Sequence, residues 1–254
     1  MIYETHTHFD DKAFDSDRDE AIKAAVAAGV TRFVNVGASI EGSRRSIELA
    51  RHYPEFAASV GVHPEDTAPL THEDMTLLEE MSKDENTVAI GEIGLDYYWD
   101  EPERDIQKKW FARQIALARK VKLPIIVHSR DAAADTLDIL KSENAKDVGG
   151  ILHCFSYSTE TARQCIDMGF YIGVGGVVTF KNGRKLKEVV AYAPLDSIVT
   201  ETDSPYMAPV PFRGKRNSSE YLSYIIEEIA RIKGISPEEV EEKTYNNAVR
   251  LFGR

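Results

Sequence analysis

Short runs of apolar and β-branched residues alternate along the chain with longer segments in which apolar residues recur every three to four positions. The short runs predict β-strands, and the longer segments predict amphipathic helices. The predicted strands cover residues 2–5, 32–36, 57–61, 88–91, 124–127, 150–152, 170–173 and 197–200. The predicted helices cover residues 18–28, 43–53, 73–83, 103–120, 132–141, 160–167, 184–192, 219–233 and 237–252.

The order of these elements indicates the fold class. Strand and helix alternate at intervals of roughly 30 residues, and no linker rich in proline, glycine or serine divides the chain. This pattern predicts an α/β fold, a (β/α)8 TIM barrel that forms a single domain over residues 1–254, with a C-terminal helical extension. The alternative is an open, doubly wound sheet, which would need a glycine-rich phosphate turn after an early strand. Residues 36–39 (VGAS) fit such a turn poorly.

Side chains that commonly bind metals follow five of the predicted strands: His6, His8, Glu92, His128, His153 and Asp203. The C-terminal ends of barrel strands meet at one mouth, so we expect these groups to converge. Side chains alternate along a strand, and His6 and His8 can therefore bind one cation from the same face. Glu92 is placed to bridge two cations. Without cations, such a cluster would leave repelling or unsatisfied polar groups, so the pattern predicts a metal site.

Three neighbouring residues carry further expectations. Glu4 shares a face with His6, and we expect its carboxylate to orient an imidazole. His63 follows the third predicted strand and reaches the same mouth, where it is expected to contact substrate or act as a general acid. Alternation points Cys154 away from His153, so we interpret this thiol as a packing residue rather than a metal ligand.

Seven segments of the chain resemble the TatD-type deoxyribonucleases: residues 5–8 (THTH), 61–64 (GVHP), 89–98 (AIGEIGLDYY), 127–132 (VHSRDA), 153–156 (HCFS), 201–206 (ETDSPY) and 213–215 (RGK). The resemblance covers essentially the whole chain, in the family's order. It implies a barrel of the metal-dependent hydrolase superfamily with a two-cation site. One cation would be held by His6, His8, Glu92 and Asp203, and the other by Glu92, His128 and His153. Position 4 is Glu where the family usually has Asp.

The resemblance also implies an activity. Members of the family hydrolyse phosphodiester bonds of DNA, often as exonucleases, and two cations can activate the attacking water. We expect Asp203 to act as general base, with Glu92 and His63 beside it in the catalytic site. Arg213 and Lys215 are expected to clamp a phosphate, and Tyr97, with the adjacent Tyr98 and Trp99, to stack on unpaired bases. The expected partner is DNA, single-stranded or at its ends.

Charge and ligand chemistry keep alternatives open. The chain has 31 basic and 42 acidic residues, a net charge of −11, which opposes tight nonspecific binding to nucleic acid. The same site would serve a hydrolase of a small ester, lactone, amide or aminoacyl ester, and a third hypothesis is a non-enzymatic binding protein on a barrel scaffold. Mixed imidazole and carboxylate ligands suit Zn, Mn, Fe or Ni more than Mg, although added Mg could support turnover.

The composition also bears on location. The longest apolar runs are far shorter than the roughly 20 residues of a membrane span, and the first residues lack the basic start of a secretory signal. The two cysteines, Cys154 and Cys165, are too few for a disulfide framework. We therefore expect a cytoplasmic protein without membrane contact, and a monomer.

Overall fold

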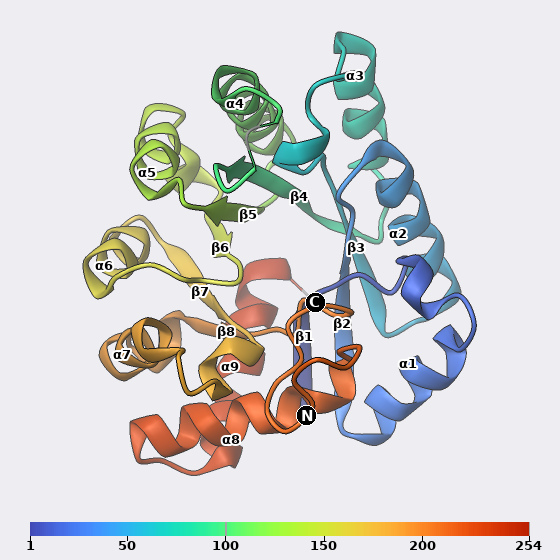
Figure 1. Cartoon of the computed structure of the whole chain (residues 1–254). Helices are drawn as coiled ribbons and strands as arrows, with labels where there is room; N and C mark the ends of the chain where they lie inside the picture. The colour runs from blue at the N-terminus through green and yellow to red at the C-terminus, as the bar shows by residue number, and fades with distance from the viewer. Residues whose placement is uncertain (100, 254) are drawn as a thin grey trace.

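The computed structural model describes residues 1–99 and 101–253 and shows a sheet of eight parallel strands with helices around it (Figure 1). The strands pair in sequence order from β1 to β8. Their bounds are β1 Ile2–Thr7, β2 Val30–Val36, β3 Phe56–Val60, β4 Thr87–Asp96, β5 Ile125–Arg130, β6 Gly150–Leu152, β7 Phe170–Val174 and β8 Ile198–Thr200.

The last strand returns to the first, and the contact lies just beyond the end of β8. Thr7 forms a parallel bridge with Ser204. The amide of His8 donates to the Ser204 carbonyl at 2.8 Å, and the amide of Asp203 donates to the His6 carbonyl at 2.9 Å. These bonds nearly close the sheet into a barrel. The predicted TIM barrel is therefore confirmed, and the alternative of an open, doubly wound sheet is wrong.

Helices follow the strands and cover the outside of the barrel. In the described residues they are α1 Arg18–Ala27, α2 Ile40–His52, α3 His72–Met81, α4 Arg104–Val121, α5 Ala133–Ser142, α6 Thr159–Asp167, α7 Arg184–Tyr192, α8 Leu222–Lys233 and α9 Pro237–Phe252. Their apolar spacing sets the buried face: α8 buries Leu222, Ile225 and Ile229, which lie one helical turn apart. Among the helices of the described residues, none is both long and apolar enough to cross a membrane.

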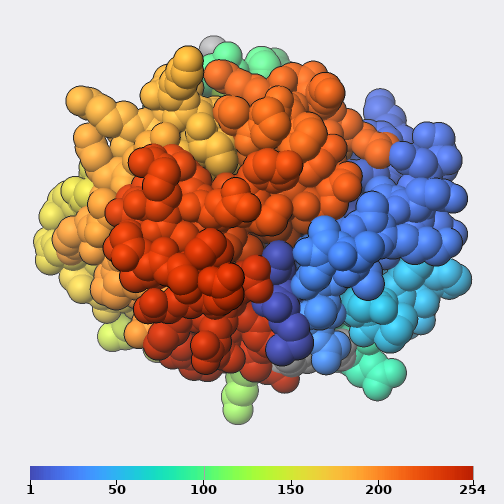
Figure 2. Space-filling view, turned by 90° about the horizontal axis from the view of Figure 1, so that it is seen from below, coloured from blue at the N-terminus to red at the C-terminus, as the bar shows by residue number. Residues whose placement is uncertain are grey.

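Helix α9 is the predicted C-terminal extension, and it covers the end of the barrel opposite the mouth. Its residues Ala248 and Phe252 belong to the same apolar cluster as barrel residues such as Tyr3 and Val34. Figure 2 shows the red C-terminal part of the chain against the dark blue N-terminal residues, where the terminal amine lies 3.2 Å from Glu241. The extension therefore supplies part of the barrel core.

The variant Phe252→Ala tests this role. Phe252 is 7% exposed and its ring lies 5.9 Å from that of Tyr3, so truncation should lower the free energy of unfolding by about 3 kcal/mol. Urea unfolding of the metal-free protein measures the loss, with Val26→Ala as control because Val26 is 40% exposed. Metal binding of the folded variant should be unchanged. A loss below about 1 kcal/mol, close to that of a surface substitution, would contradict the role given to α9.

Three strands extend further than their apolar runs predict. β1 continues to Thr7, β4 to Asp96 and β5 to Arg130. The predicted strands end at Thr5, Gly91 and Val127, but the observed strands continue through polar residues, and β4 and β5 stay paired as far as Asp96 and Arg130. As a result His6, Glu92 and His128 lie within strands rather than after them. His128 pairs with Gly94 in the ladder, whereas His6 and Glu92 lie at register shifts of β1 and β4.

Candidate metal centre

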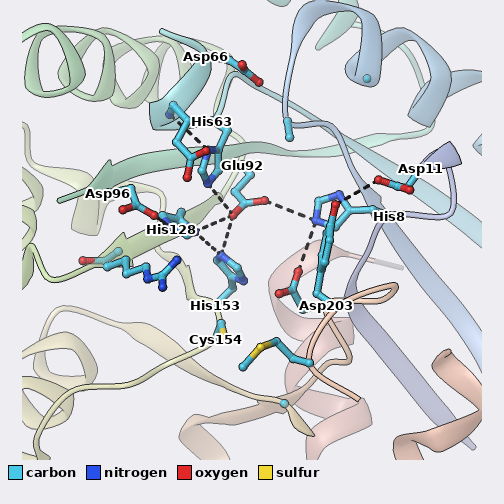
Figure 3. A pocket seen from close by; sticks show the side chains of 18 of the residues that line it. His8, Asp11, His63, Asp66, Glu92, Asp96, His128, His153, Cys154 and Asp203 are labelled. Atoms are coloured by element: carbon cyan, nitrogen blue, oxygen red, sulfur yellow. Dashed lines mark hydrogen bonds and ion pairs between the residues drawn. The ribbon is translucent and has the colours of Figure 1, made fainter. Parts of the chain in front are cut away.

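The mouth of the barrel holds a pocket of about 890 Å³. Figure 3 shows Glu92 in its centre, with His8 and Asp203 on one side and His63, His128 and His153 on the other. His6 is fully buried beside them. The structure thus brings together the side chains that the sequence placed at separate strand ends.

Glu92 points into the barrel because β4 is irregular. Strict alternation would give Glu92 the same face as Ile90, which packs in the outer cluster between barrel and helices. The pairing of β4 with β5 shifts between Ile90 and Ile93, and both of these residues pack in that outer cluster. Gly91 permits the close approach, because a Cβ there would lie 2.6 Å from the Cβ of Ile126. The shift therefore turns the Glu92 carboxylate inward.

The first ligand group consists of His6, His8, Glu92 and Asp203. The two Nε2 atoms of His6 and His8 lie 3.1 Å apart. Glu92 Oε2 lies 3.4 Å from His6 Nε2 and 3.6 Å from His8 Nε2. Asp203 Oδ1 lies 3.7 and 3.5 Å from the same two nitrogens. Ligand atoms around one tetrahedral Zn²⁺ are separated by about 3.3 Å, so this group fits a single divalent cation.

The second ligand group forms around the other oxygen of Glu92. Glu92 Oε1 lies 3.0 Å from His128 Nδ1, 2.7 Å from His153 Nε2 and 3.6 Å from His63 Nε2. His128 Nδ1 and His153 Nε2 are 3.1 Å apart. Each oxygen of Glu92 therefore faces a different set of imidazoles, which is the arrangement of a bridging carboxylate.

In two of these rings, the nitrogen that faces away from the ligand group already has a hydrogen-bond partner. His8 Nδ1 lies 2.9 Å from the carbonyl oxygen of Val36. Because a carbonyl oxygen only accepts hydrogen bonds, His8 Nδ1 must carry the proton. His128 Nε2 lies 2.9 Å from Asp96 Oδ2. In a neutral ring, such a bond places the single proton on the bound nitrogen and leaves the nitrogen that faces the ligand group free to bind a cation. Sequence reasoning missed the role of Asp96, although its place four residues after Glu92 on one strand face was a usable signal.

Glu4 differs from the expectation. Its carboxylate accepts hydrogen bonds from the amide and hydroxyl of Thr202, at 2.9 and 2.6 Å, and from the amide of His6 at 3.2 Å. Among the residues that the structure describes, it forms no hydrogen bond with an imidazole. Burial raises the pKa of Glu4 to about 7. Glu4 therefore links the backbone of β1 to the segment after β8 and does not orient a ligand ring.

Four imidazoles have strongly shifted pKa values, two of them raised and two lowered. Burial opposes charge on His8 and His128, but nearby carboxylates outweigh it: Asp203 and Glu92 raise the pKa of His8 to about 10, and Asp96 and Glu92 raise the pKa of His128 to about 9. Burial lowers the pKa of His6 to about 4 and that of His63 to about 3. In the metal-free protein, protons on two rings thus balance the carboxylates, and a bound cation would replace them.

The expected substrate contacts lie further out. Arg213 and Lys215 do not line the pocket in the described part of the chain, and the Arg213 guanidinium lies 4.4 Å over the ring of Phe180. Tyr97 donates from its hydroxyl to Asp135 at 2.5 Å. The rings of Tyr98 and Trp99 are about half exposed. The roles of Arg213, Lys215 and Tyr97 in substrate binding stay predictions.

Sequence reasoning also missed the basic side chains that line the pocket, Arg130 among them. Arg130 lines the pocket at the end of β5, and its guanidinium lies 3.8 Å over the ring of Tyr98. Lys12 and Arg45 line the same pocket. The signal was present, because Arg130 lies two residues after His128 and therefore shares its strand face.

The sequence and the fold of this chain are similar to those of known proteins. Residues 3–253 match the family model described as "TatD related DNase". The chain is 48% identical over 252 residues to the Bacillus subtilis "Uncharacterized metal-dependent hydrolase YabD", with 99% of each chain covered. It is 36% identical over 245 residues to the "3'-5' ssDNA/RNA exonuclease TatD" of Cronobacter sakazakii, covering 94% of this chain and 93% of that protein. The crystal structure of YjjV, a TatD homologue from Escherichia coli, superimposes with a TM-score of 0.94 at 30% identity, covering 100% and 98% of the two chains.

Proposed function

The chain belongs to the TatD related DNase family of metal-dependent hydrolases, and from this premise we propose that it is a deoxyribonuclease. It hydrolyses phosphodiester bonds of single-stranded DNA or of DNA ends, in the manner of an exonuclease and with two divalent cations. We further propose that it works in the cytoplasm as a single-domain monomer. The observation that supports the chemistry most strongly is the position of Glu92, whose two oxygens face two separate groups of imidazoles.

The donor set fits the proposed cations. Neighbouring atoms of four imidazoles and two carboxylates lie 2.7 to 3.7 Å apart. At these distances the lone pairs of the nitrogens and oxygens repel unless protons or cations lie between them. These ligands suit Zn, Mn, Fe or Ni, and Mg to a smaller extent. When bound, such ions lower the pKa of a water and stabilise charge on phosphate oxygens.

Asp203 is the proposed general base. Its backbone has a φ of +58°, a conformation uncommon for a residue other than glycine. Backbone bonds on both sides hold this conformation: its amide donates to the His6 carbonyl at 2.9 Å, and its carbonyl accepts from Tyr206 at 2.8 Å. The carboxylate can use one oxygen as a ligand and the other to accept the proton of the attacking water.

His63 is the proposed hydrogen-bond donor to the substrate. Its Nδ1 accepts from the amide of Glu65 at 3.3 Å, so the proton of the neutral ring is on Nε2. That Nε2–H faces the second ligand group, 3.6 Å from Glu92 Oε1. From there it can donate to a phosphate or leaving-group oxygen as negative charge develops.

Arg130 is the proposed phosphate contact, held in place by the ring of Tyr98. We expect Arg130→Ala to raise the KM for single-stranded DNA by about 10- to 100-fold, because hydrogen bonds to charged groups contribute about 1.5–3 kcal/mol. Arg130→Lys should raise the KM less than Arg130→Ala does, since lysine keeps the charge but lacks the planar guanidinium. Steady-state kinetics on an end-labelled oligonucleotide measure both effects. The control is Arg119→Ala, which removes an arginine paired with Asp147 away from the mouth, and an equal KM change in that variant would contradict a specific contact.

The direct test of the proposed function compares substrates. Purified protein loaded with Mn²⁺ or Mg²⁺ is incubated with end-labelled single-stranded DNA and, in parallel, with a panel of lactones and aryl, amide and aminoacyl esters. We expect stepwise shortening of the DNA that stops on chelation. Turnover of an ester or lactone without DNA cleavage would replace the nuclease by the small-substrate hydrolase, which the net charge of −11 favours.

A further inference from the structure

Two of the ligand rings have far nitrogens without a partner. His8 and His128 are bound through Val36 and Asp96, but the Nδ1 atoms of His6 and His153 are buried and unpaired among the residues that the structure describes. The rings of His6 and His153 stack, with centroids 4.0 Å apart and planes 11° from parallel. Their Nε2 atoms face Glu92, so their Nδ1 atoms point together toward the floor of the site.

A carboxylate lies at that floor. Glu201 is fully buried directly after β8, and one ligand atom from each of His6, His153 and Glu201 lies within 4.8 Å of the other two. One oxygen of Glu201 accepts from the amide of Cys154. The other, Oε2, is buried and unpaired within the described residues, as are the two Nδ1 atoms. Three neighbouring side chains therefore each carry a buried polar atom without a hydrogen-bond partner in the described residues. Buried polar atoms in folded proteins rarely lack a partner.

The barrel wall is shaped around this carboxylate. A Cβ on Gly173 of β7 would lie 2.5 Å from Glu201 Oε2 and 2.8 Å from its carboxyl carbon. Gly173 therefore provides the space in which the carboxylate lies. The Cys154 amide holds Oε1, so Oε2 is the oxygen left for another partner.

We propose that Glu201 is a positioning residue for both His6 and His153, acting through one buried water. One ligand atom from each of these three side chains lies within 4.8 Å of the other two, and a point between atoms at such separations is about 2.8 Å from each, a normal hydrogen-bond distance. A water there accepts from both Nδ1–H groups and donates to Glu201 Oε2, so all three atoms are satisfied. Both rings then keep Nε2 unprotonated toward the cations. The inference rests on the two-cation part of the proposed function and not on DNA as the substrate.

Two variants test the proposal in complementary ways. In Glu201→Gln, the amide of Cys154 retains the oxygen, so the new NH₂ group faces the water as a competing donor. Gly173→Ala keeps the carboxylate and displaces it by the added Cβ. We expect both variants to bind Zn²⁺ about 10- to 100-fold more weakly, as measured by competition with a chromophoric chelator. The matched control is Gly175→Ala, whose Cβ would contact the Glu201 backbone at an ordinary 3.6 Å.

Nitrogen-15 NMR of the imidazoles supplies a readout that a loss of packing alone would not produce. In the zinc-loaded wild type, His6 and His153 should show protonated Nδ1, and both variants should show a mixture of tautomers or faster exchange of that proton. Zinc affinities within twofold of wild type and unchanged tautomers in both variants would overturn the proposal. A wild type that binds fewer than two ions would instead contradict the two-cation premise, so the two failures are distinguishable.

Discussion

Replacement of the bridging carboxylate, Glu92→Gln, is expected to lower DNA hydrolysis by at least about 10³-fold. Glu92 Oε2 lies 3.4 Å from His6 Nε2, and Glu92 Oε1 lies 2.7 Å from His153 Nε2, so a single substitution weakens both ligand groups. Metal ions stabilise the transition state of phosphoryl hydrolysis by several kcal/mol, and each 1.36 kcal/mol is tenfold in rate. The initial rate on end-labelled DNA and the metal content after gel filtration should fall together.

The matched control for this variant is Glu65→Gln. Glu65 also lines the pocket, but its carboxylate belongs to neither ligand group. It should retain the metal content and nearly all activity of the wild type. Because Glu92 is only 4% exposed, circular dichroism and thermal unfolding must show that Glu92→Gln is folded. A folded variant that kept two ions per chain and a rate within tenfold of wild type would contradict the bridging role.

Replacement of the proposed general base, Asp203→Asn, is expected to have the second largest effect. The side-chain amide of this variant would still offer an oxygen to the first ligand group but could not accept a proton, and general-base catalysis contributes about 10²- to 10⁴-fold. We therefore expect kcat to fall by about this factor at saturating Mn²⁺, while the ion on the His128 and His153 side stays bound. Single-turnover cleavage at several metal concentrations separates lost chemistry from weakened metal binding.

The matched control for Asp203→Asn is Asp66→Asn. Asp66 lines the same pocket but is exposed and belongs to neither ligand group, so the substitution removes the same charge from the pocket without touching the ligands. If both variants lost activity equally, the loss would reflect the electrostatics of the pocket rather than proton transfer. A rate for Asp203→Asn within tenfold of wild type at saturating metal would exclude Asp203 as the base.

The fold and the convergence of the candidate ligand residues could be predicted from sequence for the same reason. Apolar runs separated by amphipathic segments predict parallel strands, and parallel barrel strands end at a common mouth. A histidine or carboxylate directly after such a run, such as His153 after β6, can therefore be placed without coordinates. The same reasoning predicted an extension at the C-terminus but not that Phe252 completes the barrel core, because nothing local indicates which end of the barrel a final helix covers.

The parts that sequence did not predict depend on register and on distance. Alternation alone gives Glu92 the face of Ile90, and only the shifted pairing of β4 turns it inward. Glu4 and Glu201 look equivalent as carboxylates near ligands, yet one binds backbone and the other lies at the floor beneath two rings. From sequence, Arg213 is expected to contact phosphate, and Arg130 is assigned no role. In the structure the Arg213 guanidinium lies over Phe180, whereas Arg130 lines the pocket.

The central claim is that the mouth of this barrel holds two cations joined by Glu92. Crystals of the protein soaked with Mn²⁺ and measured at the manganese absorption edge test it most directly. The account predicts two anomalous peaks in each molecule, one contacting His6 and His8 and the other His128 and His153, with Glu92 touching both. A single peak, or peaks that do not contact Glu92, would contradict it.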